Sequence, residues 1–328
     1  CECYSSVRSF KFSKWYERIM LPRGGTELQH HFLSHYVDND LLSNFQICTS
    51  IPDKIPLSKD KINILWQKNS YDQPNIYPWF QNKNNHDKFD WYIFNSHWNY
   101  EKFRYKFDVP THKCHVIKNG VTNFPVLTPY KYGDMVRMLF HVTPWRGLNV
   151  LLGAMQQLKD CNIHLDVFSS CKIYGEDFEK ANEASFEPLY EQARKLENVN
   201  YIGYKEHSFI QKFMYRYHMF AYPSIWEETS CNAALEAMAG GLYCIVTNFG
   251  ALFETCSEFP IYVTYDKNIR NLSTAFAHAI RGAVATIHEP EVSEHLQMQQ
   301  DFVKKFYSWD KKKIEWTNFL KGALNAKK

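Results

Sequence analysis

The chain has 328 residues, of which 45% are hydrophobic and 22% are charged, and its formal net charge is +3. Its length exceeds the roughly 250–300 residues at which a single hydrophobic core stops growing, so we expect two domains of ordinary size. The mild basicity suits an anionic ligand or an anionic membrane surface, but no dense block of Lys and Arg points to nucleic acid as a partner.

The nine cysteines form no Cys-x-x-Cys pair, and their number is odd. We therefore expect neither a disulfide scaffold nor a zinc site, and a reducing compartment such as the cytoplasm follows. No apolar run reaches about 18 residues, and no signal-peptide pattern is present. The sequence thus predicts a chain that is soluble or at most in peripheral contact with a membrane.

Apolar runs and amphipathic stretches alternate along the first half, a pattern typical of parallel sheets covered by helices on both faces. The clearest helices are Thr26–Val37 and His97–Phe107, and Asn95 and Ser96 are the N-cap candidates of the second. The following stretch, with Pro110, Asn119-Gly120, Pro125 and Pro129, lacks helical periodicity, and we place the interdomain linker near Phe124–Lys131. The expected strands are Arg18–Leu21, Phe45–Cys48, Ile62–Trp66, Trp91–Phe94 and His115–Ile117.

The second half repeats this alternation and predicts a second Rossmann-like unit. A helix is expected at Trp145–Leu158, and the last helix is expected within Phe306–Leu324. We place the two domains at residues 1–127 and 128–305, followed by a C-terminal helix within 306–328. The expected strands of the second domain are Met135–His141, Ile163–Phe168, Val199–Ile202, Phe220–Tyr222 and Leu242–Val246.

The segment Tyr222–Gly241 contains two carboxylates, Glu228 and Glu236, around an expected helix start. An apolar strand leads into this segment, a proline stops the strand, and Ala233–Ala239 is rich in strong helix formers. We expect Glu228 before the helix and Glu236 about two turns inside it, so the two cannot form a close acid–base pair. Each carboxylate is therefore interpreted as an acceptor for hydroxyl groups.

The start of this expected helix also predicts an anion site. Thr229 and Ser230 are its N-cap candidates, which leaves the backbone N–H groups of Cys231 and Asn232 free to point out of the helix. Such a helix end attracts phosphate. A ligand with sugar hydroxyls beside a diphosphate would satisfy both the carboxylates and the helix start, and that description fits a nucleotide sugar.

With seven residues between them and Ala-Met-Ala-Gly-Gly after them, Glu228 and Glu236 resemble the Glu-x7-Glu signature of retaining glycosyltransferases of the GT-B fold, especially glycosyltransferase family 4. The resemblance spans most of residues 18–325. It implies an α/β fold of two Rossmann-like domains whose parallel sheets flank a cleft. It also implies a nucleoside-diphosphate sugar as donor, with no metal or other cofactor. The two glutamates would then hold the donor sugar and the ribose.

The resemblance further implies the residues that hold the donor diphosphate. Gly24 and Gly25 look like the family's glycine-rich loop after the first strand, which faces the diphosphate across the cleft. Arg146 lies in a segment that resembles the family's strand end, basic residue and helix. Its guanidinium could bridge two phosphate oxygens and stabilise charge on the leaving nucleotide. Family members often carry a second basic residue five positions earlier, where this sequence has His141.

The nucleobase and the acceptor would contact other loops. Tyr204 and Lys205 lie where the family's nucleobase contacts usually arise. Lys68, Asn69 and His97 follow expected strands of the first domain, at the sheet edge where open α/β proteins bind ligands, so they are the acceptor-side candidates. The expected acceptor is a hydroxyl of a glycan, a lipid or another small molecule.

Three further features receive structural interpretations. Gly250 is expected at a strand-to-helix turn, with ligand contact as the alternative. Asp38-Asn39-Asp40 matches a short metal–nucleotide pattern, but it follows a helix instead of a strand, so no metal site is predicted. The last helix would cross back to the first domain by family resemblance, and an ordinary helix that closes the second domain is the alternative.

Two other functions stay open at this point. A sugar-nucleotide epimerase of the GT-B fold needs a donor site but no acceptor. A non-catalytic protein that binds nucleotides or carbohydrates is the second alternative. A Rossmann dehydrogenase is disfavoured because no Gly-x-Gly-x-x-Gly motif opens either half of the chain.

Overall fold

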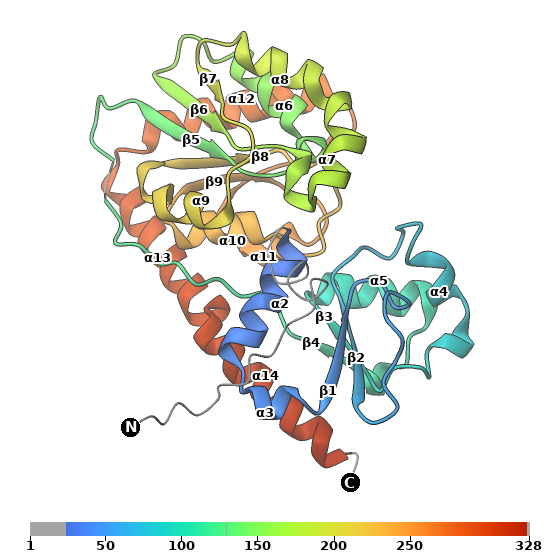
Figure 1. Ribbon diagram of the computed structural model, residues 1–328. Helices are drawn as coiled ribbons and strands as arrows, with labels where there is room; N and C mark the ends of the chain where they lie inside the picture. The colour runs from blue at the N-terminus through green and yellow to red at the C-terminus, as the bar shows by residue number, and fades with distance from the viewer. Residues whose placement is uncertain (1–23, 129, 327–328) are drawn as a thin grey trace, which may run out of the picture.

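The computed structural model describes residues 24–128 and 130–326, which form two parallel sheets with helices packed around them (Figure 1). The first sheet has four strands in the order β1-β2-β3-β4. Strand β2 is buried along its whole length, as expected for a central strand of a parallel sheet. The strands are β1 (Phe45–Thr49), β2 (Ile62–Gln67), β3 (Trp91–Phe94) and β4 (Cys114–Val116).

The helices of the first half cover this sheet. Ser96 caps α5, which connects β3 to β4, by accepting a hydrogen bond from the Asn99 backbone N–H at 2.9 Å, as its sequence predicts. The strand expected at Arg18–Leu21 lies outside the described residues. The helices are α2 (Gly25–Tyr36), α3 (Asn39–Leu42), α4 (Tyr77–Gln81) and α5 (His97–Phe107).

The second sheet has six strands in the order β10-β9-β8-β5-β6-β7. Successive strands proceed in one direction from β5 to β7 and in the other from β8 to β10, so the strand order reverses between β5 and β8. Such a reversal opens a crevice at the carboxyl ends of the strands, where ligands bind. The strands are β5 (Val136–Phe140), β6 (Ile163–Val167), β7 (Val199–Tyr201), β8 (Met219–Tyr222), β9 (Tyr243–Thr247) and β10 (Ile261–Val263).

Helices lie on both faces of the second sheet (Figure 1), as in a doubly wound α/β domain. Two contacting helix pairs, α6 with α12 and α10 with α13, pack around its core. None of the helices in the described ranges has both the length and the apolar character needed to cross a membrane. The helices are α6 (Leu148–Gln156), α7 (Glu176–Asn182), α8 (Glu187–Arg194), α9 (His207–Phe213), α10 (Asn232–Ala239), α11 (Leu252–Cys256), α12 (Ile269–Thr286) and α13 (Pro290–Tyr307).

Every strand predicted within the described residues agrees with an observed strand to within one residue at each end. Strand β10 was not predicted. The helix expected at Trp145–Leu158 begins only at Leu148. A short 3-10 turn, Pro144–Arg146, precedes it, and Gly147 has a φ of 121° beside the Pro223 carbonyl oxygen.

The last predicted helix, within Phe306–Leu324, corresponds to α14 (Trp309–Ala326). The preceding helix α13 was not predicted, and Ser308 between the two helices is extended. Figure 1 shows α14 lying beside α2 and α3, away from the second sheet. The Trp316 ring of α14 meets the Trp66 ring of β2 edge-to-face, with centroids 4.7 Å apart. Trp309 stacks on Tyr36 of α2 at 5.5 Å. The end of the chain thus completes the core of the first half.

Candidate active site

A pocket of about 330 Å³ opens where the strand order of the second sheet reverses, and residues of both halves line it. His141 follows β5 and Glu228 follows β8, whereas Lys68 follows β2 of the first sheet. All but one of the candidate residues from the sequence line this pocket: Gly24, Gly25, Lys68, Asn69, His141, Arg146, Tyr204, Lys205, Glu228, Thr229, Ser230, Cys231, Asn232 and Glu236.

Glu228 lies in the loop between β8 and α10 and is 3% exposed. Its Oε1 accepts hydrogen bonds from the Tyr222 hydroxyl at 2.5 Å and from the Arg146 guanidinium. Gly250 packs directly against the backbone of this loop. Its φ is 64°, and a Cβ there would lie 2.5 Å from the Glu228 backbone. The Ala251 N–H also donates to the Glu228 carbonyl at 2.7 Å, so the turn predicted at Gly250 positions the carboxylate.

Arg146 is a cation aimed at the pocket. Burial acts to lower the pKa of the guanidinium, but the Glu228 carboxylate overrides this and holds the pKa well above its ordinary value. The Trp226 ring lies 5.5 Å from the guanidinium carbon. Burial, together with the nearby Glu228 charge, raises the pKa of Tyr222 far above its usual value, so the phenol stays a hydrogen-bond donor. The group therefore combines one carboxylate, one neutral donor and one guanidinium.

Glu236 of α10 lies between two histidines. Its carboxylate oxygens are 2.8 Å from His207 Nε2 and 3.6 Å from His141 Nε2. Burial alone would raise the pKa of Glu236, but the two imidazoles lower it to about 2. Burial also acts to lower the pKa of His207, yet Glu236 raises it above its ordinary value of 6.5. Glu236 is thus an ionised carboxylate whose charge His207 balances.

His141 has unused hydrogen-bonding capacity. Its side chain is 4% exposed, and among the described residues neither ring nitrogen has a partner within hydrogen-bonding distance. The ring packs on Phe220 with centroids 5.2 Å apart. A buried polar group without a partner costs free energy, so a ligand group that reached His141 would recover it.

The helix after Glu228 begins later than the sequence predicts. Its N-cap is Cys231, whose Sγ accepts from the Ala234 N–H at 3.5 Å, so neither Thr229 nor Ser230 caps it. The Thr229 hydroxyl is already used, because it donates to the Lys68 carbonyl at 2.7 Å and accepts from the Asn95 amide at 3.0 Å. The free N–H groups therefore shift by one residue along the chain, and Glu236 lies about one turn inside the helix instead of two.

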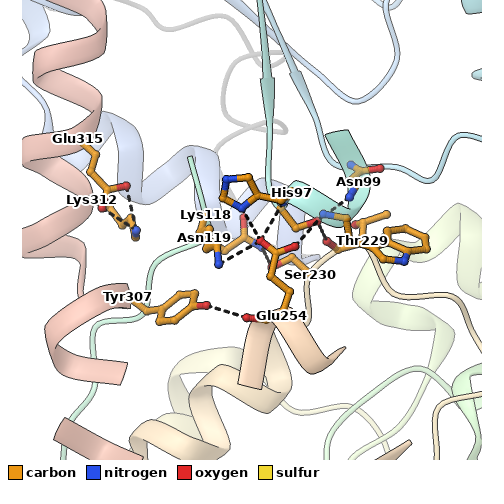
Figure 2. A network of polar contacts seen from close by, with 12 residues as sticks. His97, Asn99, Lys118, Asn119, Thr229, Ser230, Glu254, Tyr307, Lys312 and Glu315 are labelled. Atoms are coloured by element: carbon orange, nitrogen blue, oxygen red, sulfur yellow. Dashed lines mark hydrogen bonds and ion pairs between the residues drawn. The ribbon is translucent and has the colours of Figure 1, made fainter. Parts of the chain in front are cut away.

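His97 is the one candidate outside the pocket. Figure 2 shows it beside Glu254 of α11, whose Oε1 accepts from the His97 N–H at 2.9 Å and contacts His97 Nδ1 at 2.9 Å. The other carboxylate oxygen accepts from the Trp98 N–H at 2.7 Å, and Lys118 Nζ lies 3.0 Å from Oε1. Glu254 thus caps α5 across the boundary between the two halves.

Sequence reasoning missed several residues that line the pocket. His207 pairs with Glu236, Tyr174 and Trp226 lie beside Arg146, and Asn119 accepts from Lys68 Nζ at 2.7 Å. The Asn119-Gly120 dipeptide was used only as a sign of irregular structure. Its place directly after a strand of the first sheet was the available signal. For His207 no local pattern existed, because its partner lies 29 positions away.

The comparisons with known proteins come to the same region. Residues 125–284 match the family model described as glycosyl transferases group 1, a range that contains Arg146, Glu228 and Glu236. The chain carries a group 1 glycosyltransferase domain. The resemblance inferred from the two glutamates is therefore confirmed, and so is the enzyme class. Enzymes of this group take their sugar from a nucleotide sugar. No match was found among curated proteins.

Solved structures share the fold of the glycosyltransferase. A glycosyltransferase from Rickettsia africae is 16% identical, with a TM-score of 0.63, and the alignment covers 98% of this chain and 84% of that one. Sucrose-phosphate synthase from Thermosynechococcus elongatus is 15% identical, with a TM-score of 0.64 and coverage of 92% and 78%. Anabaena HepE in complex with UDP-glucose is 15% identical, with a TM-score of 0.57 and coverage of 80% and 72%. The predicted GT-B fold is confirmed.

The Asp38-Asn39-Asp40 motif of the glycosyltransferase has a local structural role. The Asp38 side chain accepts from the Leu41 N–H at 2.9 Å and so caps α3. Within the described ranges, no group of three or more His, Cys, Asp or Glu side chains has the geometry of a metal site.

Proposed function

We propose that this glycosyltransferase is a retaining enzyme that transfers a sugar from a nucleoside-diphosphate sugar to a hydroxyl of a glycan, a lipid or another small molecule. The observation that carries the proposal is the convergence of Glu228, Glu236 and Arg146 on one pocket at the strand-order reversal. Carboxylates suit sugar and ribose hydroxyls, and a guanidinium suits a diphosphate.

We assign the donor-side residues roles that their contacts support. Arg146 keeps its charge and would bind the diphosphate, stabilising the charge that develops as the nucleotide leaves. Glu228 would accept hydrogen bonds from hydroxyls of the donor sugar, and Glu236 would accept them from the ribose. Gly24 and Gly25 at the start of α2 would approach the phosphates with their backbone, and Tyr204 and Lys205 remain the proposed nucleobase contacts. All of these residues line the same pocket.

The acceptor would enter from the first half. Lys68 and Asn69 line the pocket after β2 of the first sheet. The acceptor would react on the same face of the sugar from which the nucleotide leaves, and an oxygen of the donor phosphate would take the proton of the acceptor hydroxyl. His97 is a weaker acceptor-side candidate because Glu254 already engages it. Peripheral contact with a membrane stays a prediction that depends on the acceptor.

A panel of nucleotide sugars tests the proposal. The HepE complex contains UDP-glucose, so UDP-sugars come first, followed by GDP- and ADP-sugars. We expect saturable binding of one donor and slow hydrolysis that releases the sugar with its anomeric configuration retained, as seen by NMR. Glu228→Gln and Arg146→Gln should each lower kcat/KM by about 100-fold or more.

Glu291→Gln is the matched control, since it removes an exposed carboxylate of α13 outside the pocket. It should leave hydrolysis unchanged. If no donor bound and Glu236→Gln had no effect on any activity, the proposal would be wrong. Appearance of the free donor as its epimer would instead support a sugar-nucleotide epimerase.

A further inference from the structure

Lys68 is a buried lysine with an unusual partner. The residue is 8% exposed, and its Nζ donates to the Asn119 side-chain oxygen at 2.7 Å and lies 3.8 Å from the centre of the Trp66 ring. Lys312 is buried to a similar degree and has the usual anionic partner of a buried ammonium, because its Nζ is 2.9 Å from both oxygens of the Glu315 carboxylate (Figure 2). Lys68 therefore has a neutral amide where a buried ammonium ordinarily has an anion.

The position of Lys68 connects it to two helix starts. Asn119, which accepts from Lys68, donates to the Asn232 side-chain oxygen at 2.7 Å at the first residue of α10. The Asn232 amide in turn donates to the Gly25 carbonyl at 3.2 Å, at the first residue of α2. Two helix N-termini, each of which favours an anion, thus meet beside the lysine in the pocket.

The charged groups near Lys68 can accommodate another cation. From α2, Glu27 and His30 face Lys68, and from the second half Arg146 and Glu228 share the pocket and pair with each other. His141 occupies the position where a second basic residue was expected. The Glu27 carboxylate at the start of α2 would repel a diphosphate unless a cation stood beside it.

We propose that Lys68, introduced above only as an acceptor-side candidate, serves the donor instead: its amine belongs to the diphosphate subsite and gains a proton when the diphosphate enters. This inference rests on the proposed nucleotide-sugar function. The proton comes from a buffer acid, an N–H bond forms at Nζ, and the new ammonium donates to a phosphate oxygen. The diphosphate supplies an anionic partner for an amine whose partner within the protein is the neutral Asn119 amide.

Burial supports this assignment. It holds the pKa of the Lys68 amine well below its usual value, and the nearby Glu27 opposes the shift without cancelling it. Burial is the main cause that lowers the pKa of His30, so His30 does not supply the missing charge. A phosphate oxygen beside the amine acts in the opposite direction and favours the ammonium.

Calorimetry of nucleoside-diphosphate binding tests the inference on the full chain. UDP, GDP and ADP are titrated at pH 8, where the terminal phosphate, with a pKa near ~6, carries no proton. The ligand that binds most tightly is repeated in two buffers of different ionisation enthalpy. We expect binding to be accompanied by net proton uptake. Lys68→Met should abolish this uptake and weaken binding by about 10-fold or more, and Lys68→Arg should abolish it while keeping more of the affinity.

Two controls separate Lys68 from other bases. His207→Gln should keep the proton uptake, which excludes His207 as its source, and Lys312→Met removes a buried lysine outside the pocket and should also keep it. Binding without proton uptake, or uptake that persists in Lys68→Met, would overturn this inference alone. Failure of all three nucleotides to bind would overturn the proposed function together with it.

Discussion

At the scale of single residues, the two pocket glutamates are neutralised by bases of different kinds. Glu228 is paired with a guanidinium, which keeps its charge at any pH that the fold tolerates, whereas Glu236 is paired with the His207 imidazole, whose pKa that carboxylate raises. A ligand that binds beside Glu228 therefore rearranges the charged groups there but leaves the number of charges on Glu228 and its guanidinium partner unchanged. Around Glu236, the charge of the site depends on pH.

The pair of His207 and Glu236 predicts how stability depends on pH. The pKa of Glu236 is lowered from 4.5 to about 2, so its contribution is present above pH 4.5 and is lost as pH falls toward 2. The pKa of His207 is raised above 6.5, so its contribution is present below pH 6.5 and is lost as pH rises through the raised value. We expect His207→Gln to lower the free energy of unfolding by roughly 1–2 kcal/mol between pH 4.5 and pH 6.5, and by less at higher pH.

Urea unfolding of wild type and His207→Gln at several pH values between 5 and 9 measures this difference. His278→Gln is the matched control, because His278 is exposed on α12, and it should show no such dependence. A stability difference that stayed constant or grew with pH would contradict the assigned ion pair.

At the scale of elements, two glycine turns determine where the pocket residues lie. Gly147, between the Arg146 turn and α6, approaches the Pro223 carbonyl so closely that a Cβ would be 2.1 Å from its oxygen. Gly250, between β9 and α11, does the same behind Glu228. Strand ends and helix starts thus bring the pocket side chains together only because these turns lack side chains.

Replacement of Gly250 tests this role. Gly250→Ala combines a positive φ with a backbone clash, so we expect a loss of roughly 2 kcal/mol or more in the free energy of unfolding. Donor turnover should fall as well, because the displaced loop carries Glu228. Gly282→Ala, in the interior of α12 with no atom near its added Cβ, should be neutral or stabilise by about 0.5–1 kcal/mol. Equal stabilities of the two variants would refute the argument.

At the scale of the whole molecule, the two halves are joined by the last helix and by contacts around the pocket. Helix α14 supplies Trp309, Trp316 and Leu320 to the core of the first half. Thr229 and Glu254 of the second half bond to the start of α5. The first sheet therefore depends on residues from the far end of the chain for both its core and its orientation.

Truncation of the central tryptophan of α14 measures this dependence. Trp316→Ala should cost about 3–5 kcal/mol, because it leaves a cavity against Trp66 in the first half. Ile314→Ala, on the exposed side of the same helix, should cost less than about 0.5 kcal/mol. Calorimetric scans of both variants should show an early transition only for Trp316→Ala, and matching scans would mean that α14 contributes little to this core.

Much of the fold could be predicted because its signals are local. The strands were recognised from short apolar runs, and Ser96 from its place before a helical pattern. The break at Ser308 was missed because apolar residues continue on both sides of it at helical spacing. The N-cap at Thr229 was wrong because the first half uses its hydroxyl, and no local pattern reports a partner more than 100 positions away.

The candidate site divides in the same physical way. The spacing of Glu228 and Glu236, the place of Arg146 before a helix and the glycine pair at residues 24–25 are properties of short segments, so the chain alone indicated a donor pocket for a nucleotide sugar. The pairing of Glu236 with His207, the bridge from Lys68 through Asn119 to the α10 start and the path of α14 depend on contacts between distant segments. Packing creates these contacts, and periodicity along the sequence carries no record of them.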